Sequence, residues 1–440
     1  MGRSAAADVP RPRDLLKQLL ELGLLGLLVG IACWPFNLVD RWQDRLLHLL
    51  PVYTGEAWGV ASLALACSPV LVVPLLLLLQ RGPLAAGAGS GIPQTMTSLE
   101  QPEQAERLLG PAASLQRLLL WTLASLSLMP LGREGPVVQV GAAVGHALRR
   151  RFPGWLGQLS HADLVAVAAG AGLAGGFDTP LLGVVFVVEE FISSFSSVLI
   201  WPALVIGGMA AAFSNLAGQP EFALGTLGVE PLELMQVVWA VPIGVLGGLL
   251  GGLFGRLLLR FTRLCLDLSR RYPLRLGLVV GGLLALFMLL SGGASGGDGE
   301  ALMQRLIDQG ALSSSLFVDL LNLLLRLLGP VLALGTGIPG GLIDPAFAYG
   351  AVAGHLAGSL LAGPQLGLAL GMAAGLAGAT QLPVMAVLFA VRMAGDQQLL
   401  PGLLLAAVLA AYASRLLVDQ PIYHALKAVA EAGPFRTDRR

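Results

Sequence analysis

The chain has 440 residues, of which 55% are hydrophobic and only 12% are charged, and its mean hydropathy is +0.76. This composition excludes a water-soluble globular protein. The 27 basic and 27 acidic residues balance to a net charge of zero, so the chain has no basic surface for nucleic acid and no acidic surface for a cationic partner. It is expected to lie in a lipid bilayer.

Long apolar runs recur along the chain. A hydrocarbon core about 30 Å thick needs roughly 20 mostly apolar residues for each helical crossing. Such runs fall at residues 15–34, 58–80, 114–131, 181–209, 236–255, 275–291, 316–335 and 397–418. They are continuously apolar, as from Leu75 to Leu79, which excludes the alternating strands of an outer-membrane barrel. With 58 glycines and few aromatic residues, the sequence predicts an all-α, polytopic bundle of closely packed helices.

Basic residues flank the membrane region at both ends. They are Arg3, Arg11, Arg13 and Lys17 before the first run, and Arg436, Arg439 and Arg440 at the end of the chain. By the positive-inside rule, both termini are expected in the cytoplasm. The first run lacks a small-residue cleavage site, so we expect it to remain as a helix. We assign residues 1–13 to a cytoplasmic segment and residues 427–440 to a cytoplasmic tail.

A sequence repeat divides the region between these ends. The segment Ala171–Gly175 (AGLAG) recurs at Ala374–Gly378, and Pro180 recurs at Pro383, both 203 residues later. A shared register across a proline and an apolar run indicates two duplicated halves, a plan in which transport sites lie at the repeat interface. We place the first half at residues 14–218, a linker at residues 219–230, and the second half at residues 231–426.

Three short segments rich in Gly and Pro interrupt the apolar surroundings. They are Gly89–Pro93 (GSGIP), Gly132–Pro136 (GREGP) and Gly337–Pro345 (GIPGGLIDP). Each predicts a loop that enters a helix, because Pro suits the first helical turn and Gly allows a sharp turn. The start of a helix presents unpaired N–H groups and about half a positive charge, which suits a dehydrated anion. The three breaks predict an anion pathway; an ordinary reentrant turn is the alternative for each one alone.

Hydroxyl and carboxyl groups in or near these breaks sharpen the prediction. An ion that must leave again is held better by partial charges and neutral hydroxyls than by a full cation, and Ser90 and Tyr423 supply hydroxyls. Glu134 lies between glycines in the second break, and a carboxylate in such surroundings marks an ion or proton pathway. The alternative for Glu134 is a salt bridge to a nearby Arg such as Arg133.

Taken in order, these motifs resemble the CLC family of chloride channels and chloride–proton antiporters, of the prokaryotic type without CBS domains. The resemblance covers nearly the whole chain. It is carried by Gly89–Pro93, Gly132–Pro136, the acid pair Glu189 and Glu190, the break at residues 337–345, and Tyr423. It implies a homodimer of inverted-repeat helical bundles with broken helices, and one anion pathway in each subunit.

The resemblance also implies roles for particular residues. Hydroxyls of Ser90 and Tyr423 would contact a central anion, and backbone N–H groups would complete its site. The implied anion-binding residues are Ser90, Gly91, Ile92, Leu342, Ile343 and Tyr423. Glu134 would be the gating glutamate, whose carboxylate competes with the anion for one position and swings away when protonated. Glu134 and Glu190 would transfer protons, whereas the position of Glu190 alone would indicate only an acid at a cytoplasmic helix end.

The chain departs from the family pattern at a few positions. Gln94 and Met96 replace acids that are common after the first motif, and Ile343–Asp344 replaces a usual Phe-Ala pair. Asp344 places an extra negative charge near the anion route, which bears on affinity and rate more than on the type of ion. Ser90 resembles the chloride-selective members, because nitrate-selective relatives carry Pro there.

Two other patterns suggest enzymes and are set aside. Gly170, Gly172 and Gly175 form a GxGxxG pattern, but it lies in an apolar helical stretch where helix packing is the better interpretation. No motif links a histidine to Ser90 as a general base, and no spacing suggests a metal site, so we expect neither cofactor nor metal.

The sequence therefore predicts chloride–proton exchange in a cell membrane, with a passive chloride channel as the close alternative and a membrane-embedded enzyme as a distant one.

Overall fold

The computed structural model describes residues 12–192, 197–214, 227, 237–309, 315–361 and 363–432. Within these residues the chain is helical, apart from loops and one isolated antiparallel bridge between Gly132 and Gly341. The predicted all-α class is confirmed. The predicted linker at residues 219–230, except Leu227, lies outside the described residues, as do the basic residues at the two extreme ends.

The first half of the chain contains helices of very different lengths. They are α1 (Pro12–Leu47), α2 (Pro51–Thr54), α3 (Val60–Cys67), α4 (Pro69–Leu79), η1 (Ala85–Gly87), α5 (Ile92–Glu100), η2 (Pro102–Gln104), α6 (Ala105–Leu109), α7 (Pro111–Leu126), α8 (Glu134–Arg151), α9 (His161–Phe177), α10 (Pro180–Phe186), the π-helical turn η3 (Val187–Ile192) and α11 (Ser197–Ser214).

The second half continues in the same manner. Its helices are α13 (Ala240–Arg271), α14 (Pro273–Leu290), α15 (Glu300–Gln309), α16 (Leu316–Gly335), α17 (Ile343–Leu360), α18 (Pro364–Thr380), α19 (Pro383–Ala394), η4 (Gln397–Leu399), α20 (Leu400–Ser414) and α21 (Ile422–Ala432). The last of these extends beyond residue 426, where the sequence placed the end of the membrane region.

Six helical segments of the described chain are long and apolar enough to cross a membrane. They are α1, α3 with α4, α13, α14, α16, and η4 with α20, and each overlaps one of the runs predicted from hydropathy. The predicted run at residues 114–131 becomes α7, which has 16 residues and ends at Leu126. Shorter apolar helices complete the described bundle, and α9 among them is almost wholly buried.

The prediction of one continuous run at residues 181–209 is wrong. The structure divides it into α10, the π-helical turn η3 and α11. Hydropathy averages across this stretch because apolar residues flank Glu189 and Glu190, which lie in the π-helical turn. A π-helical turn interrupts the regular hydrogen-bond ladder and often marks a functional position.

The duplication predicted from the sequence is visible in the helices. α9 and α18 each have 17 residues, and they start and end at positions 203 residues apart. Both end in a left-handed residue, Asp178 with φ of 49° and Gln381 with φ of 62°. A proline then starts the next helix, Pro180 in one half and Pro383 in the other. The two halves therefore repeat one supersecondary unit.

Glycines let the paired helices approach closely. A Cβ added to Gly354 of α17 would lie 2.1 Å from the carbonyl oxygen of Gly367 in α18, and one added to Gly172 of α9 would lie 2.1 Å from that of Val137 in α8. Membrane helices associate through such small residues. Gly172 belongs to the GxGxxG pattern, which lies within α9, so the helix-packing interpretation is confirmed.

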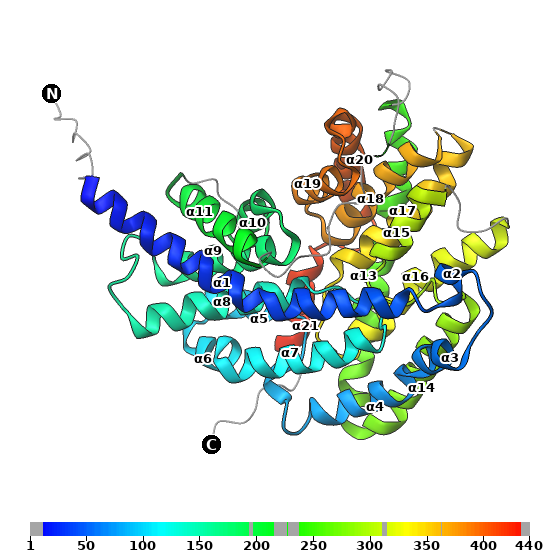
Figure 1. Cartoon of the computed structure of the whole chain (residues 1–440), viewed down its shortest axis with the longest axis horizontal. Coiled ribbons are helices and arrows are strands. Elements are labelled where there is room, and N and C mark those ends of the chain that lie inside the picture. Colours follow the sequence, from blue (N-terminus) through cyan, green and yellow to red (C-terminus); the bar gives the residue numbers. More distant parts are fainter. Residues whose placement is uncertain are drawn as a thin grey trace.

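The two halves meet around the middle of the molecule. In Figure 1 the long helix α1 crosses the front of the view, and α21 stands near the centre, between labels of first-half and second-half helices. α21 contacts α5 of the first half as well as α13 and α18 of the second. The chain therefore returns, at its end, to the level of the first Gly/Pro break.

Candidate anion pathway

The three Gly/Pro breaks come together, although they are far apart in the sequence. Gly132 and Gly341 exchange backbone hydrogen bonds of 3.0 and 2.8 Å. The N–H of Gly89 donates to the carbonyl of Gly337 at 2.8 Å. A Cβ added to Gly91 would lie 2.2 Å from the carbonyl oxygen of Gly135, so the first and second breaks also touch. All three loops thus form one cluster.

A helix begins directly after each break, as the sequence predicted. α5 begins at Ile92, α8 at Glu134 and α17 at Ile343. Because the loops touch, the starts of these three helices lie near one another. Helix starts carry partial positive charge and unpaired N–H groups, so together they form surroundings that favour an anion.

Buried polar side chains hold the loops in place. Arg117 donates to the carbonyls of Ala88 and Gly89 at 3.2 and 3.3 Å, and Trp121 Nε1 donates to the carbonyl of Gly132 at 3.0 Å. Gln80 Nε2 donates to the carbonyl of Gly337 at 3.0 Å. These bonds satisfy carbonyls that the irregular backbone leaves without helical partners. Side chains of the protein thus help to hold all three loops in place.

Glu134 lies where the second and third breaks meet. Its side chain is 0% exposed, and Oε1 accepts a hydrogen bond of 2.6 Å from the backbone N–H of Asp344. Oε2 has no hydrogen-bond partner among the described residues. A Cβ added to Gly341 would lie only 1.1 Å from Oε2, so the carboxyl group fills the space that any larger residue would need. The sequence placed Glu134 at the helix ends but missed the amide of Asp344 as its donor.

Arg133 has structural partners of its own. Its guanidinium forms an ion pair with Asp40, its Nε donates to the carbonyl of Gly176 at 2.9 Å, and it lies over the ring of Phe177 at 4.8 Å. The alternative role for Glu134 was a salt bridge to Arg133. In the structure the Arg133 guanidinium pairs with Asp40 instead. The carboxylate of Glu134 is held by a backbone amide.

An acidic cluster that no sequence spacing revealed lies beside Arg133. Asp40 of α1, Asp298 of the loop after α14 and Glu300 of α15 bring carboxylate oxygens within 4.8 Å of one another. Arg133 interacts electrostatically with Asp40, Glu300 and Asp344. Asp40 lies more than 250 residues before the other two acids, so only the fold could show that it adjoins them.

The predicted contacts in the first break are partly engaged within the protein. The N–H of Gly91 donates to Gln94 Oε1 at 2.8 Å, so Gln94 caps the start of its own helix. Ser90 packs directly against the second break, because a Cβ added to Gly135 would lie 2.5 Å from Ser90 Oγ. Ile92 is buried at the first position of α5. In the third break, Leu342 and Ile343 are buried beside Glu134.

Tyr423 is completely buried in α21, and its hydroxyl has no hydrogen-bond partner among the described residues. The hydroxyl group interacts electrostatically with Glu134, Glu190 and Asp344. A buried hydroxyl without a partner is costly, and a bound ion is one of the partners that would satisfy it. The structure thus brings Tyr423 into the surroundings of both predicted glutamates.

The two neighbouring acids of the π-helical turn have different surroundings. The carboxylate of Glu189 accepts hydrogen bonds from Val384 N at 3.1 Å and Met385 N at 2.7 Å, so it caps the start of α19. The side chain of Glu190 is 3% exposed, and neither carboxyl oxygen has a hydrogen-bond partner among the described residues. His424 Nε2 lies 3.8 Å from Oε1 of Glu190. The Glu189 carboxylate is thus held by the start of α19, whereas the buried carboxyl group of Glu190 has no hydrogen bond among the described residues.

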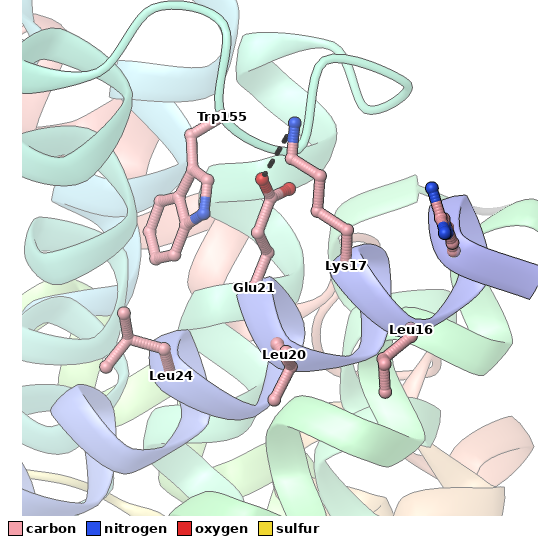
Figure 2. Close-up of a pocket in the computed structure, with 7 residues that line it drawn as sticks. Leu16, Lys17, Leu20, Glu21, Leu24 and Trp155 are labelled. Atoms are coloured by element: carbon pink, nitrogen blue, oxygen red, sulfur yellow. Dashed lines mark ion pairs between the residues drawn. The ribbon is translucent and has the colours of Figure 1, made fainter.

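A surface pocket, drawn in Figure 2, lies away from the three Gly/Pro breaks. It has a volume of about 350 Å³ and lies between α1 and the loop after α8. Figure 2 shows Leu16, Leu20 and Leu24 along α1, with Lys17 and Glu21 paired across one turn at 3.8 Å. Glu21 Oε2 also accepts a hydrogen bond of 3.1 Å from the backbone N–H of Leu156. This pocket contains none of the predicted anion or proton residues.

Comparison with known proteins identifies the family. Residues 70–415 match the family model described as voltage gated chloride channel. The chain belongs to this CLC family. Its relatives include the H(+)/Cl(-) exchange transporter ClcA of Yersinia pseudotuberculosis serotype IB (strain PB1/+), which is 28% identical over 449 residues covering 97% of this chain and 90% of ClcA. The ClcA of Yersinia pestis bv. Antiqua (strain Angola) matches with the same identity and coverage.

Solved structures share the fold of this CLC chain. The crystal structure of a slow cyanobacterial Cl-/H+ antiporter has a TM-score of 0.74 and 23% identity, and the match covers 96% of this chain and 100% of the other. A CLC-type fluoride/proton antiporter has a TM-score of 0.73 and 24% identity, with coverage of 93% and 98%. A eukaryotic CLC transporter has a TM-score of 0.73 and 22% identity, with coverage of 95% and 74%. The predicted CLC-type fold is confirmed.

Proposed function

We propose that this chain exchanges chloride for protons across a cell membrane, through one anion pathway in each subunit of a homodimer. One observation carries the proposal: the carboxylate of Glu134 occupies the place where helix starts converge, and a backbone amide binds it there. A chloride ion and a carboxylate both carry one negative charge and need the same donors. Protonation of Glu134 would remove its charge, release it from this position and let the anion take its place.

The central anion would bind deeper than Glu134, between Ser90 and Tyr423. The buried hydroxyl of Tyr423 supports this position, because it has no hydrogen-bond partner among the described residues. The same hydroxyl interacts electrostatically with Glu134 and Glu190. Amides of Ile92, Leu342 and Ile343 would complete this site at the starts of α5 and α17. The amide of Gly91 would take part only if Gln94 released it. Neutral donors suit an ion that must bind and leave rapidly.

Protons would reach the anion pathway from the cytoplasmic side of the membrane through Glu190. The contrast with Glu189 supports this choice, because Glu189 caps α19 whereas the carboxyl oxygens of Glu190 have no hydrogen-bond partner among the described residues. Burial without hydrogen bonds penalises an ionised carboxylate far more than a neutral carboxyl group, so it favours the protonated form. Tyr423 interacts electrostatically with Glu190 and Glu134, so both proton carriers would adjoin the same anion site.

The choice of ion and of coupling draws on the relatives. The two ClcA proteins are named exchangers of H(+) and Cl(-), and the structural neighbours include both a chloride and a fluoride antiporter. We propose chloride for this chain because it retains Ser90 and Tyr423. One observation favours a passive chloride channel as the second candidate: Gln94 and Met96 stand where family members commonly carry acids near the proton path.

The experiment that tests the proposal measures proton movement driven by a chloride gradient in liposomes at clamped voltage. We expect uphill proton flux from the native chain, and loss of that flux with continued chloride movement in Glu190→Gln. Glu189→Gln is the matched control and should remain coupled. Chloride movement without proton movement in the native chain would make it a channel, and movement of neither ion would exclude both functions.

The homodimer and the cytoplasmic position of both termini belong to the same proposal. Mass measurement of the purified protein in detergent should give twice the subunit mass. Cysteine labelling from each side of sealed membranes, at positions introduced near either end of the chain, should report both ends on the inner side. A monomer, or ends on opposite sides, would contradict these parts of the proposal.

A further inference from the structure

Asp344 places a second carboxyl group beside that of Glu134. It is the second residue of α17 and only 3% exposed. A Cβ added to Gly132 would lie 2.4 Å from Glu134 Oε2 and 2.6 Å from Asp344 Oδ2, so the two carboxyl oxygens adjoin the same point. The backbone N–H of Asp344 already serves Oε1 of Glu134. Asp344 therefore binds Oε1 through its backbone amide and places its own carboxyl group near Oε2.

The remaining oxygen of Glu134 needs a donor. Oε2 is buried and has no hydrogen-bond partner among the described residues. Two ionised carboxylates in contact within a buried site repel strongly, and such pairs hold a proton between them. A proton on Asp344 would remove the repulsion and would also supply the missing donor. One proton would thus relieve both the repulsion between the carboxylates and the lack of a donor for Oε2.

The surrounding charges leave an excess of acids around this pair. Asp344 interacts electrostatically with Glu134 and Arg133 of α8, Asp40 of α1, Asp298 in the loop before α15 and Tyr423 of α21, and Glu300 at the start of α15 interacts with Arg133. Arg133 is paired with Asp40, and Arg326 donates to the carbonyls of Ala294, Gly296 and Gly297. The two cations therefore already have partners other than Asp344.

We propose that Asp344 is a neutral acid whose O–H group donates a hydrogen bond into the outer anion position. With the gate closed, the acceptor is Glu134 Oε2; with the gate open, the same O–H donates to the bound anion. The proposal rests on the exchange function proposed above and adds to it a donor that the usual Phe-Ala pair of the third motif does not supply. A neutral donor stabilises the anion without the tight hold of a cation.

A simpler role for Asp344 makes different predictions. An ionised acid in the first turn of a helix is stabilised by the helix dipole, and Asp344 has this position in α17. An ionised Asp344 would repel a chloride ion and the Glu134 carboxylate alike. Its removal would then strengthen anion binding, whereas removal of an O–H donor would weaken it. The sign of the effect separates the two roles.

The test uses the Glu134→Gln background, in which the gating carboxyl no longer titrates. Calorimetry measures chloride affinity between about pH 6 and about pH 10 for E134Q, E134Q/D344N and E134Q/D344A. We expect the affinity of E134Q to fall roughly tenfold or more at alkaline pH, where Asp344 loses its proton. E134Q/D344N should keep the high affinity at every pH, because the Asn amide also donates. E134Q/D344A should bind roughly tenfold more weakly at acid pH.

Several results would overturn the donor role while leaving the proposed exchange intact. They are a pH-independent affinity in E134Q, an undiminished affinity in E134Q/D344A, or an equal pH dependence in E134Q/D344N, which retains every other acid of the cluster. Absence of chloride binding in E134Q at all pH values would overturn the exchange proposal together with the donor role.

A second measurement needs no change at residue 344. Bromide can be located by anomalous scattering in crystals of E134Q. The proposal expects bromide beside Asp344 at acid pH and a lower occupancy there at alkaline pH, while the central site near Tyr423 keeps its ion. Equal occupancy of the outer position at both pH values would contradict it.

Discussion

The two halves of the molecule have nearly the same backbone at their centre but different chemistry. α8 and α17 each have 18 residues, each follows a Gly-rich break, and the two breaks pair through Gly132 and Gly341. The first half places Glu134 at the start of its helix, whereas the second half has apolar Ile343 there. The duplication thus explains the scaffold, and the residues that break the symmetry carry the proposed function.

The same contrast holds at the π-helical turn. A shift of 203 residues places Arg392 opposite Glu189 and Met393 opposite Glu190. Glu189 reaches into the second half to cap α19, while Arg392 reaches back to pair with Asp178 at 3.3 Å. These reciprocal contacts tie the halves together. Glu190 has only an apolar counterpart, as expected for a residue kept for transport and not for packing.

The largest effect should come from the scaffold that the halves share. Gly354→Val would force α17 away from α18, because even a Cβ at this position meets the backbone of Gly367. Overpacking of this kind costs about 1–3 kcal/mol and often more where backbone must move. We expect a clearly lowered melting temperature in detergent. Gly141→Val should act alike in the first half, since a Cβ there would lie 2.3 Å from the carbonyl of Ala168.

Gly282→Val is the matched control for these two variants. It also lies inside a membrane helix, α14, but nothing lies within 4 Å of an added Cβ. The propensity cost of Val in a helix is then common to all three proteins. If Gly282→Val lowered the melting temperature as much as Gly354→Val, the close packing of α17 on α18 would not be the cause.

A large functional effect should come from the residue that most strongly breaks the symmetry. Glu134→Gln imitates the protonated carboxyl group and cannot ionise. Chloride flux through the native protein should decline between acid and neutral pH as Glu134 regains its charge, and this decline should disappear in the variant. Flux assays in liposomes over that pH range measure it, with Glu189→Gln as the control that keeps the decline. A decline that persisted in Glu134→Gln would remove Glu134 from the gate.

A smaller effect is expected at Tyr423, which lies near the end of the second half, in a helix that contacts α5 of the first half. Tyr423→Phe removes only the buried hydroxyl, whose oxygen has no hydrogen-bond partner among the described residues. A hydrogen bond to an ion contributes about 1.5–3 kcal/mol, so chloride affinity measured by calorimetry should fall roughly tenfold or more. Tyr412→Phe changes a side chain that is 66% exposed on α20 and should leave affinity unchanged. Equal affinities for all three proteins would place the anion away from Tyr423.

Much of this comparison could be predicted from the sequence because glycine and proline impose local geometry. The three breaks, the helix starts after them and the common register of Pro180 and Pro383 are all local features, and the structure retains them. Glu134 could be singled out because a carboxylate in apolar surroundings has few structural roles. Hydropathy, in contrast, failed at residues 181–209, where a π-helical turn that contains two acids lies within the apolar run.

Contacts between distant segments could not be predicted from the sequence. Three contacts illustrate this. Arg133 pairs with Asp40 across 93 positions, Glu189 caps α19 at Met385 across 196 positions, and the amide of Asp344 donates to Glu134 across 210 positions. No periodicity links such residues. Only their convergence in the fold distinguishes Glu189, which caps α19, from Glu190, whose carboxyl oxygens have no hydrogen-bond partner among the described residues.

The smallest effect is expected where α8 and α17 differ at their far ends. α8 ends in Arg149, Arg150 and Arg151, and Arg150 forms an ion pair with exposed Glu106 of the short helix α6. Hydrogen bonds from Arg150 and His146 lower the pKa of Glu106. Because the folded-state pKa lies below the unfolded value of about 4.3, this pair stabilises the fold at neutral pH.

That stabilisation should be lost as the pH falls through the lowered pKa of Glu106. Glu106→Gln should therefore lower the melting temperature slightly at pH 7, since exposed ion pairs contribute little, and the difference from the native protein should vanish in acid. Glu103→Gln removes an exposed acid three residues earlier and serves as the control. If the difference in melting temperature stayed constant down to strongly acid pH, its cause would be packing of the Glu106 side chain and not its charge. The charged end of α8 would then contribute no stability that α17 lacks.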